Sequence, residues 1–138
     1  MKVVLDCSAA LSLVLDDEHD ERAERLHGNL KKLNIVVPSI WPAELANGLR
    51  TAYRRGRVAK KDLHPALAMF DRLHVIVDDT PIDAAETLDA AMEFDLSACD
   101  ALYLLLARRE GMRLVTLDQR LEAAAARARI PLYQRTSP

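Results

Sequence analysis

The sequence predicts one α/β domain, a three-layer α/β/α sandwich around a mainly parallel sheet of four to five strands. Short aliphatic stretches alternate along the chain with segments of helical periodicity. These stretches are apolar along their whole length, which is typical of parallel strands covered on both faces. With 138 residues, 50% hydrophobic and 29% charged, the chain is large enough for one core. We expect this domain over residues 1–134 and a disordered tail over residues 135–138.

Strands are expected where β-branched and aliphatic residues cluster between polar or proline residues. Four such stretches and a weaker fifth occur, at residues 2–5, 35–37, 74–77, 113–116 and 131–133. In a parallel sheet built this way, binding sites lie beyond the carboxyl ends of the strands. Polar residues that directly follow these stretches are therefore the first candidates for a site.

Helices are expected between the strands because apolar residues recur there at spacings of three, four and seven. The ranges are 8–16, 20–33, 39–55, 62–72, 81–94, 97–110 and 118–128. The clearest apolar stripe comprises Trp41, Leu45, Leu49 and Ala52, and Pro42 lies in the first turn, where its missing N–H is harmless.

The ends of several helices carry recognisable signals. Ser39 and Thr80 are predicted N-caps, and Gly111 is expected to end the helix before it. For the first helix Ser8 is the better candidate cap, although Asp6 has the right chemistry as well. These signals fix the helix boundaries that the structure can test.

Several classes of protein are disfavoured by what the sequence contains. No run reaches about 18 uncharged apolar residues, and Asp6 interrupts the apolar start, so we expect neither a membrane span nor a signal peptide but a cytoplasmic protein. Two cysteines, Cys7 and Cys99, are too few for a disulfide framework. Gly-rich phosphate loops, serine-nucleophile motifs and zinc-ligand histidine spacings are lacking as well.

The charges are segregated although the net charge is only −2. Residues 16–24 hold six acids and one arginine, whereas residues 50–61 hold six bases and no acid. The six bases are Arg50, Arg54, Arg55, Arg57, Lys60 and Lys61. They form either a solvated helix face or a surface that binds the phosphates of a nucleic acid.

Four carboxylates occupy positions where the predicted topology would bring them together. Asp6 follows the first strand, Asp118 follows the fourth, Glu44 lies in the first turns of the helix after the second strand, and Asp100 lies in the first turn of its helix. Each has a local alternative role. Asp6 and Asp118 are good caps, Glu44 is an ordinary solvated helix residue, and Ser97 with Asp100 forms an S-x-x-D capping box.

Convergence of these acids would imply a metal ion. Two like charges about 4 Å apart repel by roughly 4 kcal/mol at an effective dielectric of 20, so the group would protonate or spread unless a cation held it. Oxygen ligands without histidine or thiolate favour Mg²⁺ or Mn²⁺. A water bound to such an ion can attack a phosphodiester. The residues thus predict a metal-dependent hydrolase of nucleic acid.

Four segments in chain order, "VVLDCSAAL", "PAELANGL", "LSACDALYLLLA" and "LVTLDQRL", together resemble the PIN-domain ribonucleases, in particular their VapC toxin branch. The resemblance implies that Asp6, Glu44, Asp100 and Asp118 are the acidic quartet that binds a divalent metal and positions a water for RNA hydrolysis. It also implies that polar neighbours orient these acids; the candidates are Ser8, Asn47, Ser97 and Thr116.

The same resemblance implies partners and products. Relatives pair as homodimers, and a VapB-like antitoxin covers the active-site groove with its C-terminal segment. Cleavage would leave 5′-phosphate and 3′-hydroxyl ends. The six bases would guide the RNA, and Tyr53 among them either stacks on a base or packs against protein.

One position departs from the family pattern, because Cys99 stands where many relatives carry an aromatic residue. Cys7 and Cys99 each adjoin a quartet acid, which leaves two interpretations: small buried residues, or a redox-sensitive pair over the site.

Two other classes of function stay open at this point. One is a non-catalytic PIN-like interaction module. The other is a phosphate-handling α/β domain such as a haloacid-dehalogenase-type phosphatase or a response-regulator receiver, although Ser8 stands where the phosphatase motif requires a second aspartate.

Overall fold

The computed structural model describes residues 1–15 and 28–133, which form a parallel sheet with helices on both sides. The strands are β1 (Lys2–Leu5), β2 (Asn34–Val37), β3 (Val75–Val77) and β4 (Arg113–Val115). Their order is β3-β2-β1-β4, and all three neighbouring pairs are parallel. The predicted fold class and four of the strands are confirmed, with boundaries shifted by at most one residue.

The fifth predicted strand is reduced to a single parallel bridge between Leu114 and Leu132. The central strand β1 lies between β2 and β4, with Leu5 opposite Val115 at its carboxyl end. Because all strands point the same way, the segments that follow β1, β2 and β4 emerge at the same edge of the sheet.

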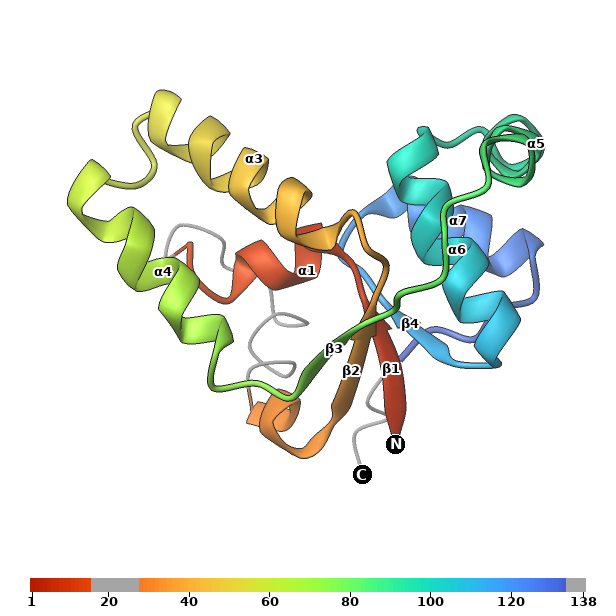
Figure 1. The fold of residues 1–138 in the computed structure, drawn as a ribbon, viewed down its shortest axis with the longest axis horizontal. Helices are drawn as coiled ribbons and strands as arrows, with labels where there is room; N and C mark the ends of the chain where they lie inside the picture. The colour runs from red at the N-terminus through yellow and green to blue at the C-terminus, as the bar shows by residue number, and fades with distance from the viewer. Residues whose placement is uncertain (16–27, 134–138) are drawn as a thin grey trace.

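The helices divide into two layers, as Figure 1 shows. On one side of the sheet lie α1 (Cys7–Ser12), α3 (Trp41–Arg54) and α4 (Leu63–Phe70); on the other lie α5 (Ala84–Phe94), α6 (Ala98–Glu110) and α7 (Gln119–Arg127). Two short 3₁₀ turns, Leu30–Lys32 and Lys60–Asp62, precede β2 and α4. Within the described ranges no helix is long and apolar enough to cross a membrane.

The core is built from β1, β2 and β4 together with the inner face of α6. Helix α6 contacts β1, β4, α5 and α7, and five consecutive residues from Tyr103 to Ala107 are buried. The predicted stripe of α3, from Trp41 to Ala52, is buried as expected, and Trp41 packs edge-on against Phe70 of α4. Thus α6 is enclosed by protein along most of its length and forms a rigid support.

The structure corrects three predicted caps. Asp6, not Ser8, caps α1 by accepting a hydrogen bond from the Ala9 N–H. Ser39 does not cap α3, which begins two residues later through a backbone turn and has no side-chain cap. Thr80 does not cap α5 either, because Asp83 accepts the Glu86 N–H and the helix begins at residue 84 instead of 81.

The first two predicted helices are also revised. The helix expected over 8–16 ends at Ser12. Of the helix expected over 20–33, residues 20–27 lie outside the described residues, and its last part is the 3₁₀ turn around Leu30. The acidic run and the predicted tail at 135–138 also lie outside them.

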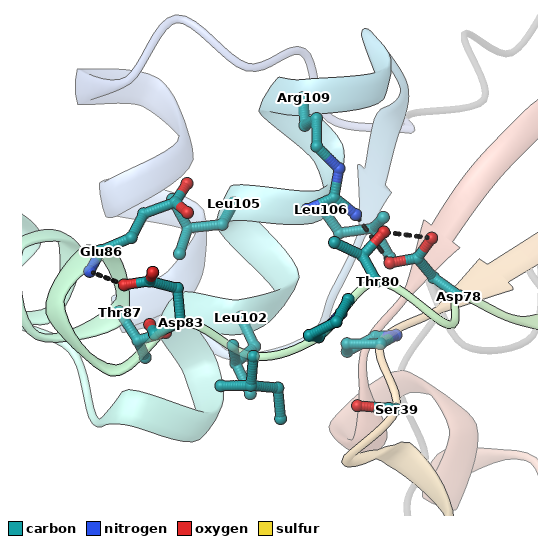
Figure 2. Close-up of a pocket in the computed structure, with 13 residues that line it drawn as sticks. Ser39, Asp78, Thr80, Asp83, Glu86, Thr87, Leu102, Leu105, Leu106 and Arg109 are labelled. Atoms are coloured by element: carbon teal, nitrogen blue, oxygen red, sulfur yellow. Dashed lines mark hydrogen bonds and ion pairs between the residues drawn. The ribbon is translucent and has the colours of Figure 1, made fainter.

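The connection between β3 and α5 is fastened to α6 by an ion pair. Arg109 Nη2 lies 2.7 Å from Asp78 Oδ2, and Thr80 donates a hydrogen bond to the other Asp78 oxygen (Figure 2). The adjoining pocket has room for only about 40 Å³, enough for water molecules. It is far too small for a nucleotide.

Gly111 ends α6 in the left-handed conformation, with φ of 63°, where a Cβ would meet no atom within 4 Å. We expect Gly111→Ala to lower the free energy of unfolding by about 1 kcal/mol, because an L-residue pays backbone strain there. Urea unfolding measures it. Gly28→Ala is the matched control, since that site is open and its φ is ordinary. Equal effects of the two substitutions would contradict this account of the helix end.

Candidate functional site

Asp6 is a carboxylate buried at the carboxyl end of the central strand, with only 3% of its surface exposed. Its backbone N–H extends the ladder by donating to the Val115 carbonyl. Its side chain turns into the start of α1, where Oδ1 accepts the Ala9 N–H at 2.9 Å. The residue therefore joins the sheet to α1 and places a negative charge at the helix N-terminus.

Two hydroxyl groups complete the surroundings of Asp6. Ser8 Oγ donates to the carboxylate at 2.9 Å, and Thr116 Oγ1 donates to Oδ2 at 2.5 Å. The same hydroxyls accept backbone N–H groups, Ser8 from Leu117 and Thr116 from Asp118. This network fixes the loop after β4 relative to the end of β1.

Asp118 and Asp100 are positioned by the starts of two helices. Asp118 caps α7, and its Oδ1 accepts the N–H groups of Arg120 and Leu121, so that Oδ2 takes no part in the cap. Asp100 lies in the first turn of α6, whose cap is Ser97, and Ser97 accepts the Asp100 N–H at 3.2 Å. Both carboxylates are half-buried.

Glu44 enters the same region from the first turn of α3. Burial is the largest cause that raises the pKa of Glu44, the neighbouring Tyr103 hydroxyl lowers this pKa, and the charge of Asp100 raises it. Its Oε1 atom is nevertheless buried without a hydrogen bond of good geometry in the described part of the protein. Glu44 is thus turned inward instead of being a solvated helix residue.

Asp100 is the neighbour that the other three acids share. Its charge raises the pKa of Asp6 and of Glu44, and the charge of Asp118 raises the pKa of Asp100 itself. For all three acids with a raised pKa, burial is the largest cause. The four acids come from four separate segments, and Asp100 interacts electrostatically with each of the other three at the carboxyl edge of the sheet.

The chemistry of these donors fits a hard divalent cation. All are carboxylates, they repel one another, and one oxygen of Glu44 is buried without a proper partner. A cation between them would relieve the repulsion that raises their pKa values. In the described residues no three such side chains are close enough to hold an ion as they stand, so binding would need side-chain adjustment.

The two cysteines flank this centre as free thiols. Burial, with the charges of Glu44, Asp6 and Asp100, raises the pKa of Cys7 to about 12, and burial also raises the pKa of Cys99. A thiol with a raised pKa is mostly protonated at neutral pH and reacts slowly with oxidants. The electrostatics favour the interpretation of these residues as small packing groups.

A hollow of about 360 Å³ lies between α1 and α3. Its lining comprises Ser8, Leu11, Leu15, Gly48, Thr51, Ala52, Arg57 and Leu117. The lining is mostly apolar. It also includes Ser8, which is hydrogen-bonded to Asp6, and Arg57, which belongs to the predicted basic surface. The hollow therefore connects the surroundings of Asp6 with the predicted basic surface.

The predicted basic residues are exposed on the outer part of α3 and the turn after it. Ten residues separate Glu44 from Arg54, roughly 15 Å along a helix, so most of these bases lie beyond direct contact with the acids. Asn47 is exposed, and within residues 1–15 and 28–133 it makes no hydrogen bond to any of the four acids. Tyr53 is exposed as well, at 43%.

Two residues near the acids were missed from the sequence. Arg120 lies close enough to Asp100 to lower its pKa, and Tyr103 faces Glu44 from the core. Arg120 follows Asp118 by two positions, and Tyr103 carries the only polar side-chain atom between Ala101 and Ala107. Both features can be read in the sequence, but neither indicates in which direction the side chain points.

Comparisons with known proteins agree with this fold. The PIN domain family matches residues 3–127. Ribonuclease VapC9 of Mycobacterium tuberculosis is 35% identical over 122 residues, covering 86% of this chain and 87% of that protein. Ribonuclease VapC3 of Pyrobaculum aerophilum is 32% identical, covering 88% and 92% respectively.

Solved structures show the same fold. PAE2754 from Pyrobaculum aerophilum aligns with a TM-score of 0.63 at 25% identity, over 90% of this chain and 79% of that one. VapBC2 from Rickettsia felis, bound to a promoter DNA fragment, aligns with a TM-score of 0.64 at 19% identity, over 96% and 97%.

The chain belongs to the PIN-domain family, in its VapC branch. The resemblance noted from the four sequence segments is thereby confirmed. The phosphatase and receiver alternatives no longer apply, since those proteins belong to other families.

The buried Asp6 predicts how stability depends on pH in the absence of divalent ions. Burial raises its pKa from 3.8 to about 6, so the folded state holds a proton that the unfolded state has released. Stability is therefore greatest below about pH 4 with respect to this group and falls as pH rises through 6, by up to about 3 kcal/mol. The raised pKa values of Glu44 and Asp100 act in the same direction.

Urea unfolding in EDTA between pH 4.5 and 7.5 measures this dependence. Asp6→Asn removes the titrating group and is expected to flatten the profile, whereas Asp89→Asn, at an exposed site on α5, should leave it unchanged. A wild-type profile that rises over this interval would contradict the assignment.

Proposed function

We propose that this protein is a divalent-metal-dependent endoribonuclease and the toxin of a toxin–antitoxin pair. The observation that carries the proposal is the meeting of four carboxylates around Asp100 at the carboxyl edge of a parallel sheet. The proposal is also supported by the relatives of this chain, which are named as ribonucleases of the VapC type. A non-catalytic interaction module would have no need to keep these four mutually repelling acids together.

Each acid has a role that its placement suggests. Asp6 and Asp100 would be the central ligands of Mg²⁺ or Mn²⁺, with Asp118 as a further ligand and Glu44 as a ligand or as the group that orients the attacking water. When bound, such an ion lowers the pKa of a water and offsets charge on the phosphate.

The surrounding residues fix this geometry before substrate arrives. Ser8 and Thr116 hold the Asp6 carboxylate, and the N–H groups at the start of α7 hold one oxygen of Asp118. Arg120 and the predicted basic surface would attract and orient the RNA backbone toward the acids. The hydrolysis needs no covalent enzyme intermediate, and 5′-phosphate and 3′-hydroxyl products follow from the family analogy.

The partners follow the same analogy. A solved neighbour is a VapBC2 complex, and another is FitAcB from Neisseria gonorrhoeae, with a TM-score of 0.60 at 17% identity. We propose that a VapB-like antitoxin covers the hollow between α1 and α3 with its C-terminal segment, and that the protein forms a homodimer. A short neighbouring gene encoding a small DNA-binding protein would support this pairing.

Purified protein should cleave RNA with Mg²⁺ or Mn²⁺ and lose this activity in EDTA. We expect Asp6→Asn and Asp100→Asn each to lower the rate at least about 100-fold, because the ion and the water lose a positioning group. Gel analysis of a labelled RNA measures the rate, and expression of the same variants tests growth arrest.

Asp89→Asn is the control for this experiment, since it removes an exposed acid of α5 outside the site. Cleavage that persists in EDTA, or full activity in both acid variants, would refute the mechanism. Absence of any cleavage by the wild type would favour the non-catalytic module.

The basic surface is tested through salt dependence. In the Asp6→Asn background, where RNA stays intact, Arg54→Glu with Arg55→Glu is expected to weaken RNA binding and reduce the salt slope by about 1 to 2. Fluorescence anisotropy over a series of salt concentrations measures both. Lys31→Glu with Arg72→Glu is the matched control, because these exposed bases precede β2 and β3 at the opposite edge of the sheet. If both pairs of substitutions gave the same salt dependence of RNA binding, Arg54 and Arg55 would be part of a solvated helix face and not of an RNA-binding surface.

A further inference from the structure

Tyr103 lies one turn deeper in α6 than Asp100 and on the same face of the helix. Residues three apart on a helix lie above one another, so the ring sits beneath the acidic cluster, on its core side. Tyr103 is 1% exposed and is among the largest fully buried side chains. Packing alone does not explain why this residue is a tyrosine, because a phenylalanine ring would fill nearly the same space.

The hydroxyl of Tyr103 is the unusual part of this side chain. Its Oη is buried, as is Oε1 of Glu44, and neither atom makes a hydrogen bond of good geometry in the described part of the protein. The two side chains nevertheless face each other closely enough that their interaction lowers the pKa of Glu44 and raises the pKa of Tyr103. The charges of Cys7 and Asp6 also raise the pKa of Tyr103. The Tyr103 hydroxyl therefore lies near the acids, on their core side.

We propose that Tyr103 is a positioning residue whose hydroxyl holds the Glu44 carboxylate in the acidic cluster. A buried hydroxyl or carboxylate oxygen without a partner is unfavourable, and each of these atoms is the partner that the other lacks. A phenol can donate one hydrogen bond, and Glu44 accepts it at Oε1. The second oxygen of Glu44 then stays available to a cation held with Asp100, whose charge raises the pKa of Glu44.

This proposal rests on the proposed function for its consequence, because a positioned Glu44 matters only if the cluster binds a cation. The contact itself does not depend on that function. The closing experiment therefore has one arm without metal or RNA and a second arm with Mn²⁺ as the probe.

The first arm is a double-mutant cycle on unfolding by urea, at pH 7.5 in EDTA. Tyr103→Phe removes a single oxygen and should lower the unfolding midpoint, since it leaves the Glu44 carboxylate buried without its donor. In the Glu44→Met background, Tyr103→Phe should leave the unfolding midpoint unchanged or raise it, because the hydroxyl then has no carboxylate to which it can donate a hydrogen bond. Equal shifts in the two backgrounds would show that the groups do not interact and would overturn the proposal.

The second arm measures Mn²⁺ binding by electron paramagnetic resonance. We expect Tyr103→Phe to weaken binding about 10-fold, as is common when a residue that orients a metal ligand is removed. Tyr133→Phe is the matched control, since it removes a hydroxyl from a half-buried tyrosine after α7 and should not change the affinity. A purely packing role for the Tyr103 hydroxyl would leave Mn²⁺ affinity unchanged, and this result would also overturn the proposal.

The two arms separate the two hypotheses. If the wild type binds no Mn²⁺ and cuts no RNA, the proposed function fails, and the cycle alone still decides whether Tyr103 holds Glu44. If the wild type binds Mn²⁺ and both arms respond as expected, Tyr103 is established as a positioning residue.

Discussion

The burial of a carboxylate at the end of the central strand constrains everything around it. Asp6 is almost fully enclosed, and an enclosed charge is tolerated only when hydrogen bonds or a cation compensate it. The compensation comes from three groups: the Ala9 N–H and the Ser8 hydroxyl at the start of α1, and the Thr116 hydroxyl after β4. The Thr116 and Ser8 hydroxyls also bind the backbone after β4. The hydrogen bonds that compensate the buried Asp6 therefore also fix the loop that leads into α7.

Helix capping and the proposed catalytic role are compatible explanations for the acids, because a carboxylate has two oxygens. Asp118 caps α7 with one oxygen, and Asp6 caps α1 while facing Asp100. A helix N-terminus stabilises the carboxylate and restrains its rotamer, so the cap is the means by which the acid is positioned. Asp100 differs, since Ser97 caps α6 and also interacts with the Asp100 side chain, whose charge acts on Asp6 and Glu44 and is itself affected by Asp118.

The predictable part of the fold follows from local chemistry. The aliphatic strands, the apolar stripe of α3 and the stop at Gly111 are recorded in short stretches of sequence, and all are found in the structure. The predicted caps Ser39 and Thr80 failed because a cap depends on the exact residue at which the helix begins. A backbone turn starts α3 later, and the Asp83 side chain caps α5 later, than the sequence predicted. The fifth strand shrank to one bridge at Leu132 for a similar reason, since too few backbone groups align beside β4.

The sequence by itself determined the class of fold, the family, and the identity of four acids placed after strands or at helix starts. Only the tertiary structure decided that Asp100 is their common neighbour, that Glu44 turns inward, and that Tyr103 meets it from the core. The physical reason is range. Periodicity and capping act over a few residues and can be read along the chain, whereas burial and repulsion between charges depend on which segments the fold brings together, here those that carry Asp6, Glu44, Asp100 and Asp118.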